Sequence, residues 1–258
     1  MNILDVKNLT MRFGGLVAVD NLSFSIAENS ISSLIGPNGA GKTSAFNCLT
    51  GFYKASEGEI IFQGTNVVKK KPYVITYLGM ARTFQNLRLF KNMTVLENAM
   101  AGMHNRTKSG ILGAIFYNKN QVNEEAEIKK QSLACLEFVG ILDKKDKLAC
   151  NLSYGDQRRL EWARAIATQP KLILLDEPAA GLNHDEKEQL IKLIKRIRDE
   201  LKITVLLIEH DMGLVMKISE HIIVLDYGRK IAEGNADKIK NDPRVIEAYL
   251  GKDEDDAI

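Results

Sequence analysis

The residues with the clearest capacity for chemistry lie in the stretch GPNGAGKT, which runs from Gly36 to Thr43. It fits the pattern G-x-x-x-x-G-K-[S/T] of phosphate-binding loops, in which glycines let several backbone N–H groups turn toward one phosphate chain. A buried strand is expected before this loop and a helix after it, and the N-terminal end of a helix attracts anions. The sequence therefore predicts a loop that holds the phosphates of a nucleotide.

The side chains at the end of this loop extend the prediction. Lys42 can offer a point charge to the terminal phosphates, Thr43 can ligate Mg²⁺, and Ser44 can reach a phosphate oxygen. The residues expected to bind the nucleotide here are Gly36, Pro37, Asn38, Gly39, Ala40, Gly41, Lys42, Thr43 and Ser44.

Two carboxylates and a histidine follow other apolar runs, in LILLDEP and LLIEHD. The carboxyl ends of parallel strands line the ligand crevice of an α/β sheet. Asp176 is therefore expected to hold Mg²⁺ through a water, and Glu177 to orient or deprotonate an attacking water. His210 stands where it can touch the terminal phosphate, with a purely structural role as the alternative for a single histidine.

Nearly continuous runs of branched residues predict the sheet that positions these groups. Such runs are typical of parallel strands that are covered on both faces, and they lie at 31–36, 172–176, 203–209 and 221–226. The N-terminal stretches ILDVKNLTMRF and LSFSIAENS instead alternate apolar with polar residues, which predicts an antiparallel piece.

The middle of the chain is expected to be helical. NEEAEIKKQSLACLEFVGIL (123–142) has apolar residues at helical spacing, and another helix is expected from 155 to 168, before Pro170. The stretch at 102–120 is interpreted as an inserted loop with a short helix. The predicted fold class is therefore α/β. A single domain over 1–258 would have its nucleotide-binding core at 1–85 and 169–258, with an antiparallel β part, and an α-helical subdomain inserted at 86–168.

Composition and charge exclude several classes of protein. The net charge of the 258 residues is only +2, which gives no general argument for a nucleic-acid partner. The three cysteines are widely spaced and predict neither a disulfide framework nor a metal site. The N-terminus does not resemble a signal peptide, and the longest apolar runs are too short to span a bilayer. A membrane role is therefore expected only through a partner.

Taken in order, the motifs resemble those of the nucleotide-binding subunits of ATP-binding-cassette (ABC) transporters along nearly the whole chain. GPNGAGKT matches the Walker A loop, RTFQN the Q-loop, LSYGDQRR (152–159) the signature LSGGQ, LILLDE Walker B, and AAGLN (179–183) the D-loop. The resemblance implies a P-loop NTPase core of the RecA-like type, with ATP and Mg²⁺ as cofactors.

The resemblance also implies a role for single residues outside the Walker A loop. Phe13 would stack on adenine, and Glu177 would be the catalytic base. His210 would be the switch histidine, and Gln85 would contact Mg²⁺ or water and sense the membrane subunit. The implied catalytic residues are thus Glu177, His210 and Gln85, and the implied metal ligands are Thr43, Gln85 and Asp176.

The signature segment (152–159) implies a second subunit, because in this family it binds the γ-phosphate of ATP that the partner subunit holds. Ser153 and Gly155 keep the family pattern, whereas Tyr154 and Asp156 replace its first glycine and its glutamine. A carboxylate facing phosphate would be unfavourable, so Asp156 is expected to point away. Asn183 ends the D-loop where the family usually has Asp.

Longer stretches resemble the ATP-binding subunit of the bacterial high-affinity importer for branched-chain amino acids. They are GMARTFQNLRLFKNMTVLENAMAGMH, NLSYGDQRRLEWARAIATQPKLILLDEPAAGLN and LLIEHDMGLVMKIS. The resemblance implies two transmembrane permease subunits, a second ABC ATPase subunit (in a homo- or heterodimer) and, indirectly, a periplasmic or extracellular substrate-binding protein. It places the chain at the cytoplasmic face of the membrane. The region with Gln85, Phe90 and Met93 would relay motion to a permease helix, with ordinary core as the alternative.

Other functions remain open at this point. Related ABC ATPases serve urea, amides, other amino acids or lipopolysaccharide export. A soluble ABC switch protein acting on nucleic acid would usually have two cassettes or a coiled coil, and this chain has neither. A kinase-like P-loop enzyme would give the signature segment no role.

Overall fold

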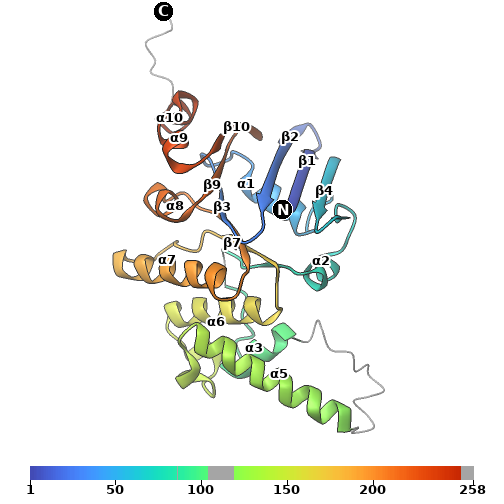
Figure 1. The fold of residues 1–258 in the computed structure, drawn as a ribbon, viewed down its shortest axis with the longest axis vertical. Coiled ribbons are helices and arrows are strands. Elements are labelled where there is room, and N and C mark those ends of the chain that lie inside the picture. The colour runs from blue at the N-terminus through green and yellow to red at the C-terminus, as the bar shows by residue number, and fades with distance from the viewer. Residues whose placement is uncertain (86, 104–118, 251–258) are drawn as a thin grey trace, which may run out of the picture. The chain divides into compact units, whose positions relative to one another are not determined.

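The computed structural model in Figure 1 describes residues 1–85, 87–103 and 119–250. The chain divides into two compact units: unit 1 comprises Met1–Ile75 and Leu172–Ile258, and unit 2 comprises Thr76–Lys171. Unit 2 begins before and ends after the predicted helical subdomain at 86–168. One reason is that the Lys171 N–H donates to the Gly79 carbonyl at 2.7 Å, which joins the segments that enter and leave the unit. The predicted insertion at 102–120 lies mostly outside the described residues.

Unit 1 contains an antiparallel sheet of four strands in the order β2-β1-β4-β5. Its strands are β1 (Asn2–Phe13), β2 (Leu16–Ala27), β4 (Glu57–Phe62) and β5 (Thr65–Asn66). Leu4 and Val6 of β1 are buried and Lys7 is exposed, because alternate side chains of a strand point to opposite faces. A register shift between Val6 and Leu9, where Asn8 has φ 50°, leaves Asn8 exposed as well and returns Leu9 to the buried face. The predicted antiparallel piece is confirmed.

The second sheet of unit 1 has the strand order β10-β9-β3-β8-β7. Its strands are β3 (Ile31–Ile35), β7 (Leu172–Asp176), β8 (Thr204–Ile208), β9 (His221–Asp226) and β10 (Arg229–Gly234). The first four pair in parallel, and β10 adds an antiparallel edge. Every residue of β3, β7 and β8 is buried, as predicted from their continuous apolar runs.

Several helices of unit 1 begin after a residue whose side chain caps them, whereas the helix after the phosphate loop has no side-chain cap. α7 starts after Asn183, whose side chain accepts from the Glu186 N–H while the Glu186 carboxylate accepts from the Asn183 N–H. The buried stripe of α7 is formed by Leu190, Ile191, Ile194 and Ile197. The helices are α1 (Lys42–Leu49), α7 (His184–Asp199), α8 (Met212–Ile218), α9 (Ala236–Lys240) and α10 (Pro243–Leu250), while α2 (Pro72–Leu78) spans the boundary between the units.

Unit 2 is mainly helical, as predicted. It contains the short strand β6 (Met80–Arg82), the helices α3 (Val95–Met103), α5 (Lys119–Phe138) and α6 (Tyr154–Ala167), and the 3₁₀ turns Leu142–Lys144 and Ala149–Asn151. The three α-helices pack against one another, side by side in Figure 1. Helix α5 ends earlier than the predicted 142, because Gly140 adopts a left-handed conformation (φ 77°) and the Ile141 N–H returns to the Leu136 carbonyl at 3.0 Å.

Within the part of the chain that the structure describes, no helix combines the length and the apolar character needed to cross a lipid bilayer.

Strand β8 lies between β3 and β7, and its Leu206 is completely buried. We expect Leu206→Ala to lower the free energy of unfolding by about 2–5 kcal/mol, because it removes packed atoms and leaves a cavity. Urea unfolding followed by circular dichroism measures this loss. The control Leu16→Ala, at a 65% exposed position, should change the free energy by less than about 0.5 kcal/mol. Equal effects of the two substitutions would contradict the central place of β8.

Candidate nucleotide-binding and catalytic site

The predicted phosphate loop follows β3 and leads directly into α1. Gly41, the residue before α1, has φ 96°, and a Cβ there would lie 2.3 Å from the Ala18 carbonyl oxygen of β2. A side chain at this position would therefore be strained and would collide with backbone. Glycine at 41 lets the loop turn tightly beside the antiparallel sheet, so that the first turn of α1 faces the space the loop surrounds.

Lys42 is the buried charge of this loop. Its ammonium donates to the carbonyl oxygens of Gly36 at 2.7 Å and Pro37 at 2.8 Å, and the residue is only 8% exposed. Burial lowers the pKa of Lys42 by removing water from the charged form, while the negative charge of Glu177 acts in the opposite direction. The loop thus encloses a cation that neutral carbonyls stabilise only in part. A phosphate chain would supply the missing negative charge.

Three further predicted residues lie at or just after the ends of β7 and β8, in unit 1. Because these strands are parallel neighbours, Asp176 and Glu177 lie beside the residues that follow Ile208. The Glu177 N–H donates to the Ile208 carbonyl at 3.0 Å, and His210 Nδ1 lies 3.9 Å from Glu177 Oε2. Strand β3 is the other parallel neighbour of β8, so the loop that follows β3 begins at the same edge of the sheet as Glu177 and His210.

Glu177 has an unusual backbone conformation. Its φ of 47° lies in the left-handed region, which a residue with a branched or long side chain rarely adopts. Such conformations persist only where surrounding contacts hold them, and they concentrate at functional sites. The Glu177 side chain is 23% exposed and that of His210 is 59% exposed, so solvent reaches both.

The oxygen atoms required for Mg²⁺ are present in unit 1. Mg²⁺ in nucleotide sites binds one or two protein oxygens, together with phosphates and water. Thr43 provides a hydroxyl in the first turn of α1, and Asp176 provides a largely buried carboxylate. No group of three acidic, histidine or cysteine side chains suited to a metal ion occurs among the described residues.

Phe13 is the last residue of β1 and is 42% exposed. Its ring packs edge-to-face against Tyr53, with centroids 5.2 Å apart and an interplanar angle of 81°. This contact fixes the ring while leaving part of it open to solvent. The geometry is compatible with the predicted stacking on adenine.

The signature segment lies in unit 2, where Ser153 caps α6. The Ser153 hydroxyl accepts from the Asp156 N–H at 3.2 Å and donates to Asp156 Oδ2 at 2.7 Å. The same Oδ2 accepts from Lys144 Nζ at 2.7 Å. Although burial opposes it, hydrogen bonds from Lys144 and Ser153 hold the pKa of Asp156 below its ordinary value. Lys144 therefore compensates the carboxylate that replaces the family's glutamine.

The remaining departures from the family pattern also have structural partners. The Tyr154 hydroxyl accepts from Arg158 Nη2 at 2.7 Å, and its ring is half exposed. Asn183 uses its side chain to cap α7. Gly155, in contrast, has no left-handed φ, and apart from its chain neighbours and the backbone of its own helix no described atom lies within 4 Å of the position that a Cβ would take. The folded chain itself therefore gives no reason for glycine at 155.

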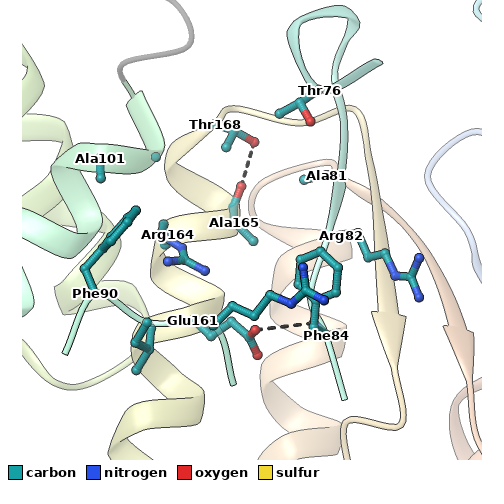
Figure 2. Close-up of a pocket in the computed structure, with 13 residues that line it drawn as sticks. Thr76, Ala81, Arg82, Phe84, Phe90, Ala101, Glu161, Arg164, Ala165 and Thr168 are labelled. Atoms are coloured by element: carbon teal, nitrogen blue, oxygen red, sulfur yellow. Dashed lines mark hydrogen bonds between the residues drawn. The ribbon is translucent and has the colours of Figure 1, made fainter. Parts of the chain in front are cut away.

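Unit 2 also contains a groove of about 560 Å³, lined by residues that include Phe84, Arg88, Phe90, Glu161 and Arg164. Figure 2 shows Phe90 and Phe84 on opposite sides, with Arg164 and Glu161 of α6 between them. The guanidinium of Arg88 lies 4.1 Å from the Phe84 ring centroid, and that of Arg164 lies 5.6 Å from the Phe90 centroid. The groove thus combines aromatic faces with positive charge.

Glu161 lies at the base of this groove and is 2% exposed. Its Oε1 accepts from the Phe84 N–H at 3.3 Å, and within the described residues its Oε2 has no hydrogen-bond partner (Figure 2). Burial raises the pKa of Glu161, while the Phe84 N–H and the nearby arginines oppose this shift. The groove therefore lies over a buried carboxylate that is only partly paired.

The buried Asn98 shapes the rim of the groove. Its side chain accepts from the Phe90 N–H at 3.0 Å and donates to the carbonyls of Phe90 and Thr94, each at 3.0 Å. With these hydrogen bonds in place, Phe90 is 50% exposed and Met93 is 41% exposed. Two large apolar side chains are thus held at the surface by a buried polar contact.

The structure distributes the predicted residues over both units. Unit 1 unites the phosphate loop, Asp176, Glu177 and His210, whereas Gln85, Ser153 and Gly155 belong to unit 2. Gln85 is exposed. Sequence reasoning missed Glu161 and also Glu209, which is buried next to His210. The apolar run LLI directly before Glu209 was the available signal for that buried carboxylate.

Comparison with known proteins agrees with this arrangement. The family model described as ABC transporter matches residues 19–180, which include the phosphate loop, the signature segment and the β7 carboxylates. The chain belongs to the ABC transporter family. It is an ATP-binding, ATP-hydrolysing subunit of this family, and the predicted cassette fold is confirmed. A second model, described as branched-chain amino acid ATP-binding cassette transporter, matches residues 229–255.

Individual relatives resemble this ABC ATPase along nearly its whole length. The high-affinity branched-chain amino acid transport ATP-binding protein LivG of Salmonella typhimurium is 46% identical over 250 residues, covering 97% of this chain and 98% of the relative. BraF of Pseudomonas aeruginosa has the same identity over the same length. A nucleotide-free cassette from an ABC transporter has a TM-score of 0.84 at 35% identity, covering 98% of this chain and all of that one. The ADP conformation of the ABC transporter cassette MJ1267 has a TM-score of 0.85 at 34% identity, with the same coverage.

The two loop glycines give a matched test of nucleotide binding. We expect Gly41→Ala to weaken ATP binding by about tenfold or more, because the new Cβ is both strained and in collision with the Ala18 carbonyl. Gly39 has φ 83°, but nothing lies within 4 Å of its Cβ position, so Gly39→Ala should weaken binding less. Titration with a fluorescent ATP analogue measures both. A larger loss in Gly39→Ala would contradict the packing of the loop against β2.

Proposed function

We propose that this ABC ATPase powers an importer for the branched-chain amino acids leucine, isoleucine and valine. The observation that carries the ATPase role is that the loop with Lys42, and also Glu177 and His210, follow the ends of adjacent parallel strands. The substrate is supported by the names of the relatives LivG and BraF and by the family model that matches 229–255. ATPases for urea, amides, other amino acids or lipopolysaccharide are the alternatives.

In the proposed reaction, the Lys42 ammonium leaves the Gly36 and Pro37 carbonyls and binds the β- and γ-phosphate oxygens. Glu177 accepts a proton as water attacks the γ-phosphorus, and the bond to the bridging oxygen breaks to give ADP and phosphate. His210, beside Glu177, contacts the γ-phosphate. Mg²⁺ would neutralise charge on the phosphates, and Thr43, Asp176 and Gln85 are the residues that would hold it.

We further propose that Ser153 and Gly155 act on ATP bound to a second subunit, either another copy of this chain or a related one. The open space at Gly155 and the helix N-terminus capped by Ser153 both suit the approach of a phosphate. A 25% identical cassette with a TM-score of 0.75 has been solved as a dimer in a post-hydrolysis state with ADP and phosphate. Each ATP would then hold two subunits together until hydrolysis removes the γ-phosphate.

The groove in unit 2 is proposed to bind a cytoplasmic helix of a permease subunit. Phe90 lines the groove and is half exposed, and the nearby Met93 is 41% exposed, so both provide apolar contact area for such a helix. Two permeases and a substrate-binding protein on the other side of the membrane would complete the transporter. The chain would thus lie at the cytoplasmic face of the cell membrane, and no nucleic acid takes part.

The catalytic assignment is tested by Glu177→Gln. We expect it to reduce ATP turnover by about 100- to 10,000-fold, because it removes the general base, while ATP still binds. Lys42→Ala should instead weaken binding itself, since it removes the cation of the loop. Steady-state hydrolysis and nucleotide titration separate the two effects. Unchanged turnover in Glu177→Gln would refute its role as the base.

The transport assignment is tested by reconstituting the chain with its permeases in vesicles that contain ATP. Uptake of labelled leucine, isoleucine or valine should exceed that of urea and of unrelated amino acids. Phe90→Ala should reduce uptake while leaving the hydrolysis rate of the isolated chain within about twofold, because Phe90 lies in the groove of unit 2. Preferred uptake of urea would overturn the substrate, and full uptake with Phe90→Ala would overturn the docking role.

A further inference from the structure

Glu209, which follows β8, is a completely buried carboxylate that joins two segments of unit 1. Its Oε1 accepts from the Ala179 N–H at 2.7 Å, and its Oε2 accepts from the His210 N–H at 3.2 Å. Ala179 lies two residues after Glu177, so one carboxylate binds the backbone of both segments that carry the proposed catalytic side chains. The Asp211 N–H also interacts with it.

The segment that begins at Glu177 and contains Ala179 forms a strained, tight turn. Glu177 has φ 47°, and the turn continues with the Ala180 N–H donating to the Glu177 carbonyl at 3.2 Å and the Leu182 N–H to the Ala179 carbonyl at 3.2 Å. A strained backbone keeps its conformation only where other contacts determine it. The short hydrogen bond from the Ala179 N–H to Glu209 is such a contact. It links the strained turn after β7 to the neighbouring segment after β8.

The chemistry of this position requires a carboxylate. An ionised carboxylate only accepts hydrogen bonds, so both of its oxygens can face N–H groups. Burial raises the pKa of Glu209, while the N–H groups of Ala179, Asp211 and His210 oppose this shift by stabilising the ionised form. Burying a carboxylate is unfavourable where an apolar side chain could fill the space. Its presence therefore indicates that the backbone contacts matter.

We propose that Glu209 is a positioning residue for ATP hydrolysis, which fixes the Glu177 turn relative to His210 by binding the backbone of both. The inference rests on the proposed roles of Glu177 and His210. It adds to the pairing of β7 with β8, after whose ends these two side chains lie 3.9 Å apart. Glu209 touches neither nucleotide nor water in this account and acts only through the two segments.

The test compares Glu209→Gln and Glu209→Asp in the full chain. The glutamine has nearly the same shape, but its amide NH₂ must face a backbone N–H, so two donors meet. We expect Glu209→Gln to lower kcat for ATP by about ten- to a hundredfold, with KM and the ATP dissociation constant within about twofold. Glu209→Asp keeps the charge and the acceptors, so it should recover part of the lost kcat.

A matched control is Glu97→Gln. The Glu97 carboxylate also accepts a backbone N–H, from Thr94 at 2.7 Å, but it lies in unit 2 on the first turn of α3. Its substitution should leave kcat within about twofold. Circular dichroism and thermal unfolding confirm that each variant is folded. If Glu209→Gln does not fold, Glu209→Asp alone must show the reduced kcat at unchanged KM.

The double variant Glu177→Gln, Glu209→Gln distinguishes positioning from general destabilisation. If Glu209 acts through Glu177, the double variant should be no slower than Glu177→Gln alone, because the effects of coupled residues are not additive. A kcat of Glu209→Gln within twofold of the wild type, or fully additive losses, would overturn the inference. An active Glu177→Gln would refute the proposed base instead, so the two failures are separable.

Discussion

The buried ammonium of Lys42 is the interaction on which the rest of the site depends. Two carbonyl oxygens of its own loop hold it, and its environment lowers its pKa, so the free protein contains a cation without a full set of counter-charges. A phosphate chain can supply those charges. Gly41 makes this arrangement possible, because only glycine can occupy the tight turn against the Ala18 carbonyl. The backbone of the loop thus already has the conformation that the proposed nucleotide site requires before a ligand binds.

Hydrolysis requires a second arrangement, at the ends of β7 and β8. The strained Glu177 and the exposed His210 are close because their strands are parallel neighbours, and Glu209 binds the backbone of both segments. Unit 2 follows a similar principle, since Asp156 and Lys144 orient the Ser153 hydroxyl, and Asn98 holds the loop that exposes Phe90. In each case a buried or paired polar group fixes a side chain for which we propose a role toward ATP, a second subunit or a permease.

Much of this arrangement could be predicted from local sequence. The bounds of β7 and β9 were predicted to the residue, because their apolar runs are continuous and end at Asp176 and Asp226. The early end of α5 at Phe138 was missed, since apolar spacing continues past the left-handed Gly140 that stops the helix. Glu209 and the partner of Asp156 were also missed. Their contacts join residues 30 and 12 positions apart, and such contacts depend on which elements become neighbours.

The most direct measurement of the central claim is the crystal structure of Glu177→Gln with MgATP. The account predicts that Lys42 Nζ will have left the Gly36 and Pro37 carbonyls and will lie at hydrogen-bond distance, about 2.7–3.2 Å, from β- or γ-phosphate oxygens. Residue 177 and His210 should face the γ-phosphate. A nucleotide bound elsewhere, or one bound in the loop while Lys42 still donates to both carbonyls, would contradict the account.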